Sequence, residues 1–278
     1  MPTGIVRHGD PESFLRRAKP WLMRTEAENN LVLGLALRAS TADEIYVATA
    51  EQDGAVVGCA LRTPPHMLLL TRMPPAAVPA LAVDVAACYD TLPAVHGPPA
   101  AAREFALHWS AWHDCAMRDG MEQRIYVLTR VRQPRNPPPG SLRFATSDDL
   151  GLVASWMACF GDEVRHDVGA SQAQVAARIA ARDLALWCDD QPRTLAGYAG
   201  RTPNGVRIGY VYTPPEWRGR GYASACVAAL SERALREGAQ FCCLYTDLSN
   251  PVSNAIYMRI GYEPVCDAID IHFETTRK

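Results

Sequence analysis

Residues that could hold a phosphate lie together near position 220. Residues 218–223, called the glycine loop below, read RGRGYA and separate an apolar strand-like run from an amphipathic, helix-like stretch. The N-terminus of a helix offers unpaired backbone N–H groups and the positive end of the helix dipole, which suit a phosphate or pyrophosphate. Glycine at positions 219 and 221 leaves no Cβ between the backbone and such a ligand. The glycine loop therefore predicts a phosphate site.

Two other interpretations of the glycine loop stay open at this point. The loop could be a tight turn whose two arginines are solvated. It also approximates a dinucleotide-binding fingerprint, with Ser224 in place of the third glycine and Asp247 after a later strand. That fingerprint follows its strand almost immediately, whereas residues 213–217 intervene here, so the dinucleotide interpretation is weak.

A second pattern of interest begins at Asn250. Asn250 and Pro251 are typical of the start of a helix, an N-cap side chain followed by proline in the first turn. Tyr257 lies beside the apolar stripe of this helix, and Gly261 ends it. Taken alone, Asn250 is a cap and Tyr257 is an aromatic residue at the edge of a core.

Together the two patterns resemble the GNAT acetyltransferase superfamily. Its glycine loop has the form Gln/Arg-x-x-Gly-x-Gly/Ala, which residues 218–223 match. Its later signature is an Asn, a Tyr seven residues on, and then Gly-Phe or Gly-Tyr, matched here by Asn250, Tyr257, Gly261 and Tyr262. The whole chain looks like tandem GNAT proteins whose N-terminal copy is degenerate. The resemblance implies an N-acetyltransferase that moves an acetyl group from acetyl-CoA to a primary amine.

The resemblance also implies a cofactor site. In such enzymes the strand before the glycine loop splays from its neighbour, pantetheine pairs with the exposed backbone, and the loop N–H groups hold the pyrophosphate. Gly209 inside that strand is consistent with a bulge or a close approach. The residues expected to bind the cofactor are Val211, Tyr212, Thr213, Arg218, Gly219, Arg220, Gly221, Tyr222, Ala223, Ser224 and Asn250.

Direct attack of a neutral amine on a thioester needs two proton transfers. A tyrosine with a pKa of about 10 can protonate a departing thiolate, whose conjugate acid has a pKa of roughly 8.5 to 10. Tyr257 is the expected general acid. Glu163 and His166 could accept the amine's proton, directly or through water, although both are otherwise simply exposed loop charges.

The elements that must position these residues repeat in two halves. In the first half we expect helices over 12–17, 29–37, 78–89 and 101–118, and strands over 45–50, 55–62, 67–71 and 124–130. In the second half we expect helices over 149–160, 171–182, 222–237 and 252–259, and strands over 142–145, 185–188, 194–200, 206–212, 241–246 and 269–274. The similar order suggests a duplicated domain.

A proline-rich segment divides the two halves, because consecutive prolines stiffen an extended connector. We expect a degenerate GNAT-like domain over 1–132, a linker over 133–141 and a catalytic GNAT domain over 142–278. The expected fold class is α/β with a mixed α+β sheet: two tandem GNAT-like acyl-CoA N-acyltransferase domains, each a mixed, splayed sheet flanked by helices.

The first half is expected to have lost its cofactor site. The segment after its third strand, residues 71–79, contains no glycine. Prolines at positions 74, 75 and 79 also remove backbone N–H donors from the turn that would have to grip a pyrophosphate.

Composition limits the partners. The net charge of -2 argues against a broad nucleic-acid or acidic-membrane surface. No apolar run approaches the roughly 20 residues of a membrane span, and residues 1–10 lack a signal-peptide core, so we expect a cytoplasmic protein. The nine cysteines form no Cys-x-x-Cys pair, which disfavours a metal. We expect a small-molecule or peptide amine as substrate, and a monomer or homodimer.

Two other functions remain open. The protein could be a coenzyme A-binding regulatory module without catalysis, or a transferase of a longer acyl chain. Release of thiol from acetyl-CoA in the presence of amines would separate the first of these from an acetyltransferase.

Overall fold

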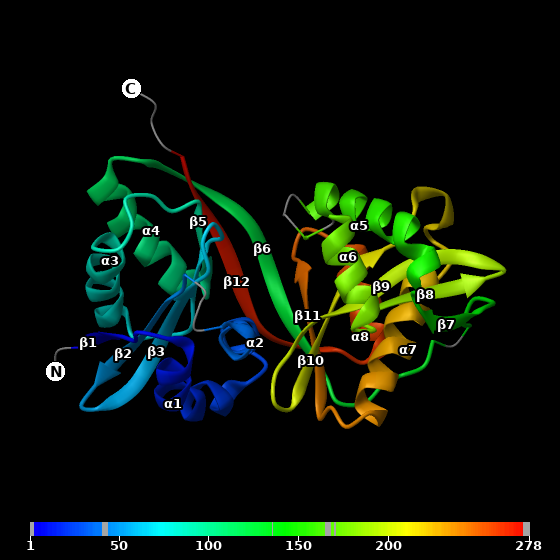
Figure 1. Ribbon diagram of the computed structural model, residues 1–278, viewed down its shortest axis with the longest axis horizontal. Helices are drawn as coiled ribbons and strands as arrows, with labels where there is room; N and C mark the ends of the chain where they lie inside the picture. The colour runs from blue at the N-terminus through cyan, green and yellow to red at the C-terminus, as the bar shows by residue number, and fades with distance from the viewer. Residues whose placement is uncertain (1–2, 41–43, 135, 165–167, 170, 275–278) are drawn as a thin grey trace. The chain divides into compact units, whose positions relative to one another are not determined.

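The computed structural model describes residues 3–40, 44–134, 136–164, 168–169 and 171–274 (Figure 1). The helices are α1 (Pro11–Leu22), α2 (Asn30–Arg38), α3 (Val78–Ala86), α4 (Pro99–His113), α5 (Leu150–Val164), α6 (Gln172–Ala180), α7 (Tyr222–Arg236) and α8 (Pro251–Ile260). The strands are β1 (Gly4–Arg7), β2 (Tyr46–Gln52), β3 (Ala55–Arg62), β4 (Leu68–Leu70), β5 (Ala94–Gly97), β6 (Ala116–Leu128), β7 (Ser141–Phe144), β8 (Leu184–Asp189), β9 (Gln191–Arg201), β10 (Gly205–Tyr212), β11 (Phe241–Asp247) and β12 (Glu263–Glu274).

The chain forms two compact units. The first consists of Met1–Ile125, Thr246–Asn250 and Pro264–Lys278, and the second of Tyr126–Tyr245 and Pro251–Glu263. This division differs from the one expected at the proline-rich segment, because the chain crosses between the units more than once. A sequence pattern marks a strand but does not say which sheet the strand joins.

The first unit contains the sheet order β1-β2-β3-β4-β5-β12-β6. Neighbours are antiparallel from β1 to β4, β4 and β5 are parallel, and β12 runs antiparallel to β5. The last strand of the chain, red in Figure 1, thus lies inside the sheet of the first unit. Its residues Ile269 and Ile271 are buried with Phe105 and Trp109 of α4. On the other face, α1 and α2 pack against β2 and β3.

The second unit contains the end of β6 followed by the order β11-β10-β9-β8-β7. One core lies between the sheet and helices α7 and α8, and another between the sheet and helices α5 and α6. Tyr126 and Leu128 of β6 belong to the first of these cores. The proline-rich segment therefore lies within this unit, where the indole N–H of Trp187 donates to the carbonyl of Pro139 at 2.9 Å.

The helices and strands expected in the second half are all present, with ends that shift by a few residues, and β12 begins earlier than expected. In the first half the helix expected over 101–118 is wrong beyond His113. Asp114 ends α4 with a left-handed φ of 45°, and β6 begins at Ala116. Strands β1 and β5 were not predicted, because β1 is mostly exposed and both are only four residues long.

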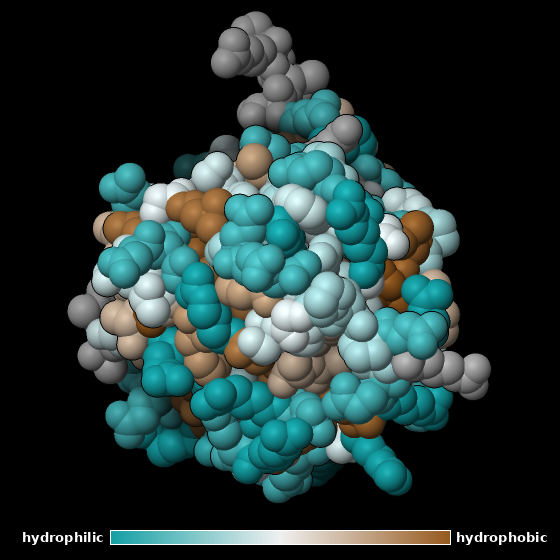
Figure 2. Space-filling model, turned by 90° about the vertical axis from the view of Figure 1, so that its right-hand side faces the viewer, coloured by the Kyte–Doolittle hydropathy of each residue, from teal (hydrophilic) through white to brown (hydrophobic). Residues whose placement is uncertain are grey.

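The surface of the second unit carries both hydrophilic and hydrophobic residues. Figure 2 shows hydrophilic side chains surrounding smaller hydrophobic patches on the face turned to the viewer. Within the described ranges, every helix is too short or too polar to cross a bilayer.

Candidate functional site

The strands before and after the glycine loop separate from each other. Parallel pairing between β10 and β11 runs from Gly205 with Phe241 to Arg207 with Cys243. Beyond that point β10 continues to Tyr212 and β11 to Asp247 without further pairing between them. The splay predicted for the sheet of the second unit is therefore confirmed. It leaves backbone hydrogen-bonding groups of β10 on that side available to an extended ligand.

A bulge lies on the same stretch of β10. The register with β9 shifts between Gly209 and Tyr212, and Tyr210 takes a left-handed φ of 55°. A Cβ on Gly209 would lie 2.9 Å from the Cβ of Ala199, which only glycine avoids. The bulge predicted from Gly209 is confirmed, and it re-aims the strand just before the glycine loop.

The end of β10 is held by side chains. The Thr194 hydroxyl donates to the carbonyl of Tyr212 at 2.7 Å and lies 2.7 Å from the Thr213 hydroxyl. The Thr213 carbonyl accepts from Nε of Arg218 at 2.8 Å. Two of the three residues whose backbone was expected to pair with pantetheine, Tyr212 and Thr213, therefore already have an engaged carbonyl.

The glycine loop has the conformation that its glycines predict. Gly219 and Gly221 have φ values of 75° and 85°, in the region that favours glycine. A Cβ on Gly219 would meet nothing within 4 Å, so this face of the loop is open. Helix α7 begins directly after Gly221, which caps it without a side chain. The N–H groups of its first turn, at Tyr222, Ala223 and Ser224, have no acceptor inside the helix.

A cluster of side chains supports this loop. The Tyr222 hydroxyl donates to Asp189 at 2.8 Å, and this bond is the main reason why the pKa of Tyr222 is raised. Two guanidinium groups lie over the ring of Trp217, that of Arg193 at 3.7 Å and that of Arg220 at 4.8 Å from the ring centre. Through these contacts, Asp189 of β8 and Arg193 of β9 hold the residues at the start of α7 in place.

Two members of that cluster were missed in the sequence. Arg193 is only 8% exposed, and its Nε and Nη1 have no hydrogen-bond partner among the described residues. Asp189 lies 4.0 Å from this Nε. The available signal was an arginine directly before the strand expected over 194–200, but nothing in the sequence links β9 to a loop more than twenty residues later.

Glu163 lies beside the glycine loop. Its carboxylate accepts a hydrogen bond from Nη2 of Arg218 at 2.5 Å, and both side chains are about half exposed. The structure thus brings the expected base and the first residue of the loop together. His166, the other candidate base, lies outside the described residues.

Tyr257 belongs to the same unit. It lies on α8, is 9% exposed, and packs edge-on against Tyr262 with ring centres 6.0 Å apart. Burial raises the pKa of Tyr257 to about 12, so the phenol holds its proton at neutral pH. Asn250 directly precedes α8 in the chain but belongs to the first unit, where its N–H donates to the carbonyl of Asp247 at 3.1 Å.

The first unit lacks the corresponding opening. Parallel pairing of β4 and β5 continues to Leu69 with His96, and a Cβ on Gly97 would lie 2.9 Å from both the Cβ and the carbonyl oxygen of Leu70. The strands therefore stay close to the end of β4. Residues 75–77 then form a short 3₁₀ helix that begins with proline. These features support the expected loss of a cofactor site in this half.

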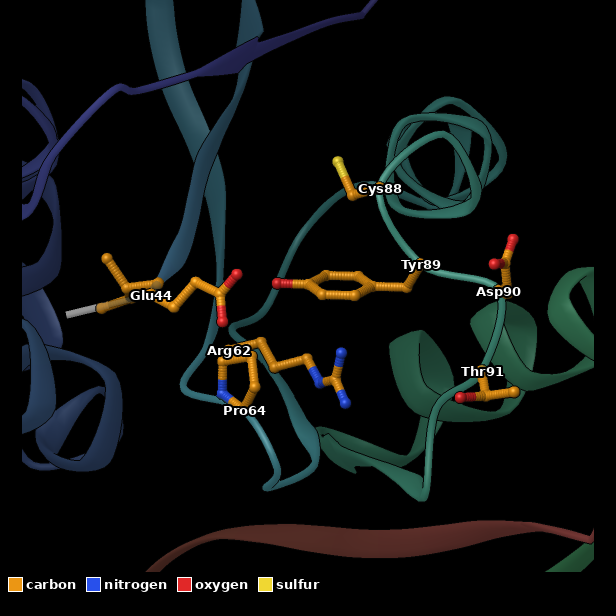
Figure 3. Close-up of a pocket in the computed structure, with 8 residues that line it drawn as sticks. Glu44, Arg62, Pro64, Cys88, Tyr89, Asp90 and Thr91 are labelled. Atoms are coloured by element: carbon orange, nitrogen blue, oxygen red, sulfur yellow. The ribbon is translucent and has the colours of Figure 1, made fainter.

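The first unit instead contains a cavity of about 330 Å³ (Figure 3). The guanidinium group of Arg62 lies there 4.1 Å from the ring centre of Tyr89, with Glu44 and Asp90 on the same lining. None of the predicted site residues lines this cavity. Among the residues that the structure describes, no group of three or more His, Cys, Asp or Glu side chains is placed to hold a metal.

Comparison with known proteins agrees with this geometry. The FR47-like protein family matches residues 187–268, which include β10, the glycine loop and α8. A GNAT-family acetyltransferase from Colwellia psychrerythraea is 11% identical with a TM-score of 0.60, covering 99% of this chain and all of its own. A GCN5-related N-acetyltransferase from Sphaerobacter thermophilus is 16% identical with a TM-score of 0.62, covering 97% and 95%.

A tandem GNAT protein from the clavulanic acid biosynthesis pathway is also similar along its whole length. It is 16% identical with a TM-score of 0.56, covering 98% of each chain. No curated protein sequence matches the chain. At these identities the likeness to solved structures concerns the fold.

Proposed function

We propose that this chain, whose fold is that of tandem GNAT proteins, is an N-acetyltransferase that moves an acetyl group from acetyl-CoA to a primary amine. The observation that carries the proposal is the separation of β10 from β11 after Arg207, directly ahead of the glycine loop. A splayed strand and a helix N-terminus in series suit a ligand with an extended amide arm and a pyrophosphate. The open space beside Gly219 leaves room for such a ligand.

In this proposal the chain's own residues bind and move protons. The first-turn N–H groups of α7 and the side chain of Arg218 bind the pyrophosphate, and β10 orients the pantetheine arm. Asn250 contacts the cofactor arm. Acetyl-CoA supplies the acyl group as a thioester, whose C–S bond breaks as the C–N bond forms. Tyr257 gives its proton to the departing thiolate, and Glu163 takes the amine's proton, directly or through water.

The acceptor is proposed as a small-molecule or peptide amine. We place the reaction in the cytoplasm, carried out by a monomer or homodimer, with no nucleic acid, membrane or metal involved. The charge of -2 and the mixed surface of the second unit support a freely diffusing partner over a polyanionic one.

Calorimetry and thiol release test this function together. We expect one molecule of acetyl-CoA to bind per chain, to raise the melting temperature, and to release thiol only when a suitable amine is present. No binding, or two equivalent sites per chain, would contradict the proposal. Binding without thiol release across a broad amine panel would instead favour a coenzyme A-binding regulatory module. Faster release of thiol from coenzyme A thioesters with longer acyl chains would show that the transferred group is longer than acetyl.

A further inference from the structure

Arg218 connects the two sides of the proposed reaction. It is the first residue of the glycine loop, yet its side chain is hydrogen-bonded to residues outside the loop. Nε donates to the carbonyl of Thr213 at 2.8 Å and Nη2 to Glu163 at 2.5 Å. The other loop arginine, Arg220, lies over Trp217 instead. The residue expected to bind pyrophosphate is thus paired with the residue expected to take the amine's proton.

The position of Glu163 explains why it pairs with Arg218. Glu163 lies in the last turn of α5, which ends at Val164 and has no basic residue in that turn. The negative end of the helix dipole disfavours a carboxylate there, so a neighbouring cation is stabilising. The pair is nevertheless about half exposed on both sides, and exposed ion pairs contribute little free energy. A pyrophosphate at the loop offers Arg218 a stronger, bidentate partner.

Building on the proposed function, we propose that the Arg218–Glu163 ion pair is a latch between cofactor and acceptor. When a pyrophosphate group binds the glycine loop, Arg218 leaves Glu163 for the phosphate oxygens. Glu163 then has a free carboxylate that can accept a proton from the amine. The latch raises the fraction of Glu163 that is available as a base when the cofactor binds, and the pair competes weakly with cofactor binding.

Glu163 and the pyrophosphate compete for Arg218 in this proposal. A double-mutant cycle measures the competition through the affinity for coenzyme A, so that no catalytic activity is needed. The variants are Glu163→Gln, Arg218→Gln and both together, titrated calorimetrically with coenzyme A at constant ionic strength. Because an exposed pair is worth roughly 0.2–1 kcal/mol, Glu163→Gln should tighten binding by about 1.5- to 5-fold. In the Arg218→Gln background, where no latch exists, the same substitution should tighten binding by no more than a general loss of negative charge does.

A matched control separates the latch from general electrostatics. Glu216 is an exposed carboxylate in the turn just before the loop, and it makes no ion pair within the described residues. Glu216→Gln should tighten binding less than Glu163→Gln does, and by the same factor whether or not Arg218 is present.

The outcomes are distinct. Tightening by Glu163→Gln that depends on Arg218 supports the latch. Tightening by the same factor with and without Arg218, unchanged affinity, or weakened affinity overturns the latch while leaving the proposed function intact. Failure of the wild-type protein and every variant to bind coenzyme A overturns both.

Discussion

Tyr257 has two roles to be distinguished, that of a buried core side chain and that of the proposed proton donor. Its ring belongs to the core of the second unit, and burial raises its pKa to about 12. The phenol is consequently protonated at any working pH, as a proton donor must be, but the raised pKa also makes it a weaker acid than an ordinary tyrosine with a pKa of about 10. Its neighbour Tyr262 is also fully buried, but the Tyr262 hydroxyl is already paired with that of Ser231 at 2.8 Å. The two tyrosines therefore make a matched pair for separating the two roles.

We predict that Tyr257→Phe lowers turnover by about 10²- to 10⁴-fold, as expected for loss of a general acid, with acetyl-CoA affinity nearly unchanged. Tyr262→Phe should instead lower the melting temperature through the lost hydrogen bond, at a cost of roughly 1 kcal/mol, and leave turnover intact. Steady-state kinetics and thermal melts on both variants check this. Full activity in Tyr257→Phe would assign the side chain to packing alone.

Gly219 provides a second prediction for a single residue. Gly219→Ala places a methyl group in open space that we propose the pyrophosphate occupies. We expect the affinity for coenzyme A to fall by about tenfold or more, equivalent to about 1.4 kcal/mol.

Gly238 is the matched control for Gly219. It lies just after α7, has a φ of 107°, and a Cβ there would also meet nothing within 4 Å. Gly238→Ala should lower the melting temperature at least as much as Gly219→Ala, because both force alanine into a left-handed region. Coenzyme A affinity should be unchanged. An equal loss of affinity in both variants would show that the effect is stability alone.

The start of α5 illustrates how an element in the second unit is stabilised. Asp149 accepts from the Thr146 N–H at 2.8 Å in the capping box of the short 3₁₀ helix Ser147–Asp149, which leads directly into α5. It also accepts from both terminal nitrogens of Arg143 at 2.6 and 2.8 Å. The Arg143 hydrogen bonds are the largest cause that lowers the pKa of Asp149 from 3.8 to about 2. A carboxyl whose folded pKa is depressed stabilises the fold above its unfolded pKa, and this contribution disappears as the pH falls through the folded value.

We predict that Asp149→Asn destabilises the protein by about 1 kcal/mol at pH 7, or a few degrees in melting temperature. The difference from wild type should shrink as the pH falls from about 4 to about 2, the window set by the two pKa values. Asp148→Asn, at the exposed neighbouring position, should have little effect at either pH. A pH-independent deficit would mean that the charge on Asp149 is not what stabilises the helix.

Elements with a strong periodic pattern were the predictable ones. Helix α7 was identified by its amphipathic pattern and by the glycine loop that opens it, and its predicted start at Tyr222 is confirmed. Strand β1 offered no such pattern, because three of its four residues are exposed. The start of β6 is also exposed, so Ala116–Asp119 showed no alternation and was taken for the end of a helix.

The site was predictable only where a local motif exists. The glycine loop and the bulge at Gly209 follow from glycines close together in sequence, and the structure shows both conformations. Asp189 and Arg193 reach the loop through strand pairing, which a single sequence does not reveal. The assignment of Tyr257 and Glu163 to catalysis stays a prediction.

At the scale of the whole molecule, the path of the chain decides which fragments can fold. Tyr126 and Leu128 precede the proline-rich segment, yet both are buried in the core of the second unit. We predict that a fragment of residues 126–263 is folded and binds coenzyme A, whereas a fragment of residues 141–278 is unstable. Circular dichroism and calorimetry on the two fragments check this. Equal stability and affinity would show that β6 is dispensable to the second unit.

The position of β12 has a consequence in time. A ribosome makes most of the first unit first, but the strand that fills the gap between β5 and β6 emerges only after almost the entire second unit. At roughly 5–20 residues per second, the stretch from residue 126 to residue 263 takes on the order of ten seconds to synthesise. Throughout that interval two strand edges lack their partner, and unpaired edges are sites of aggregation. The unit whose synthesis begins first is therefore completed last. While it lacks β12, its unpaired strand edges are exposed to binding by chaperones.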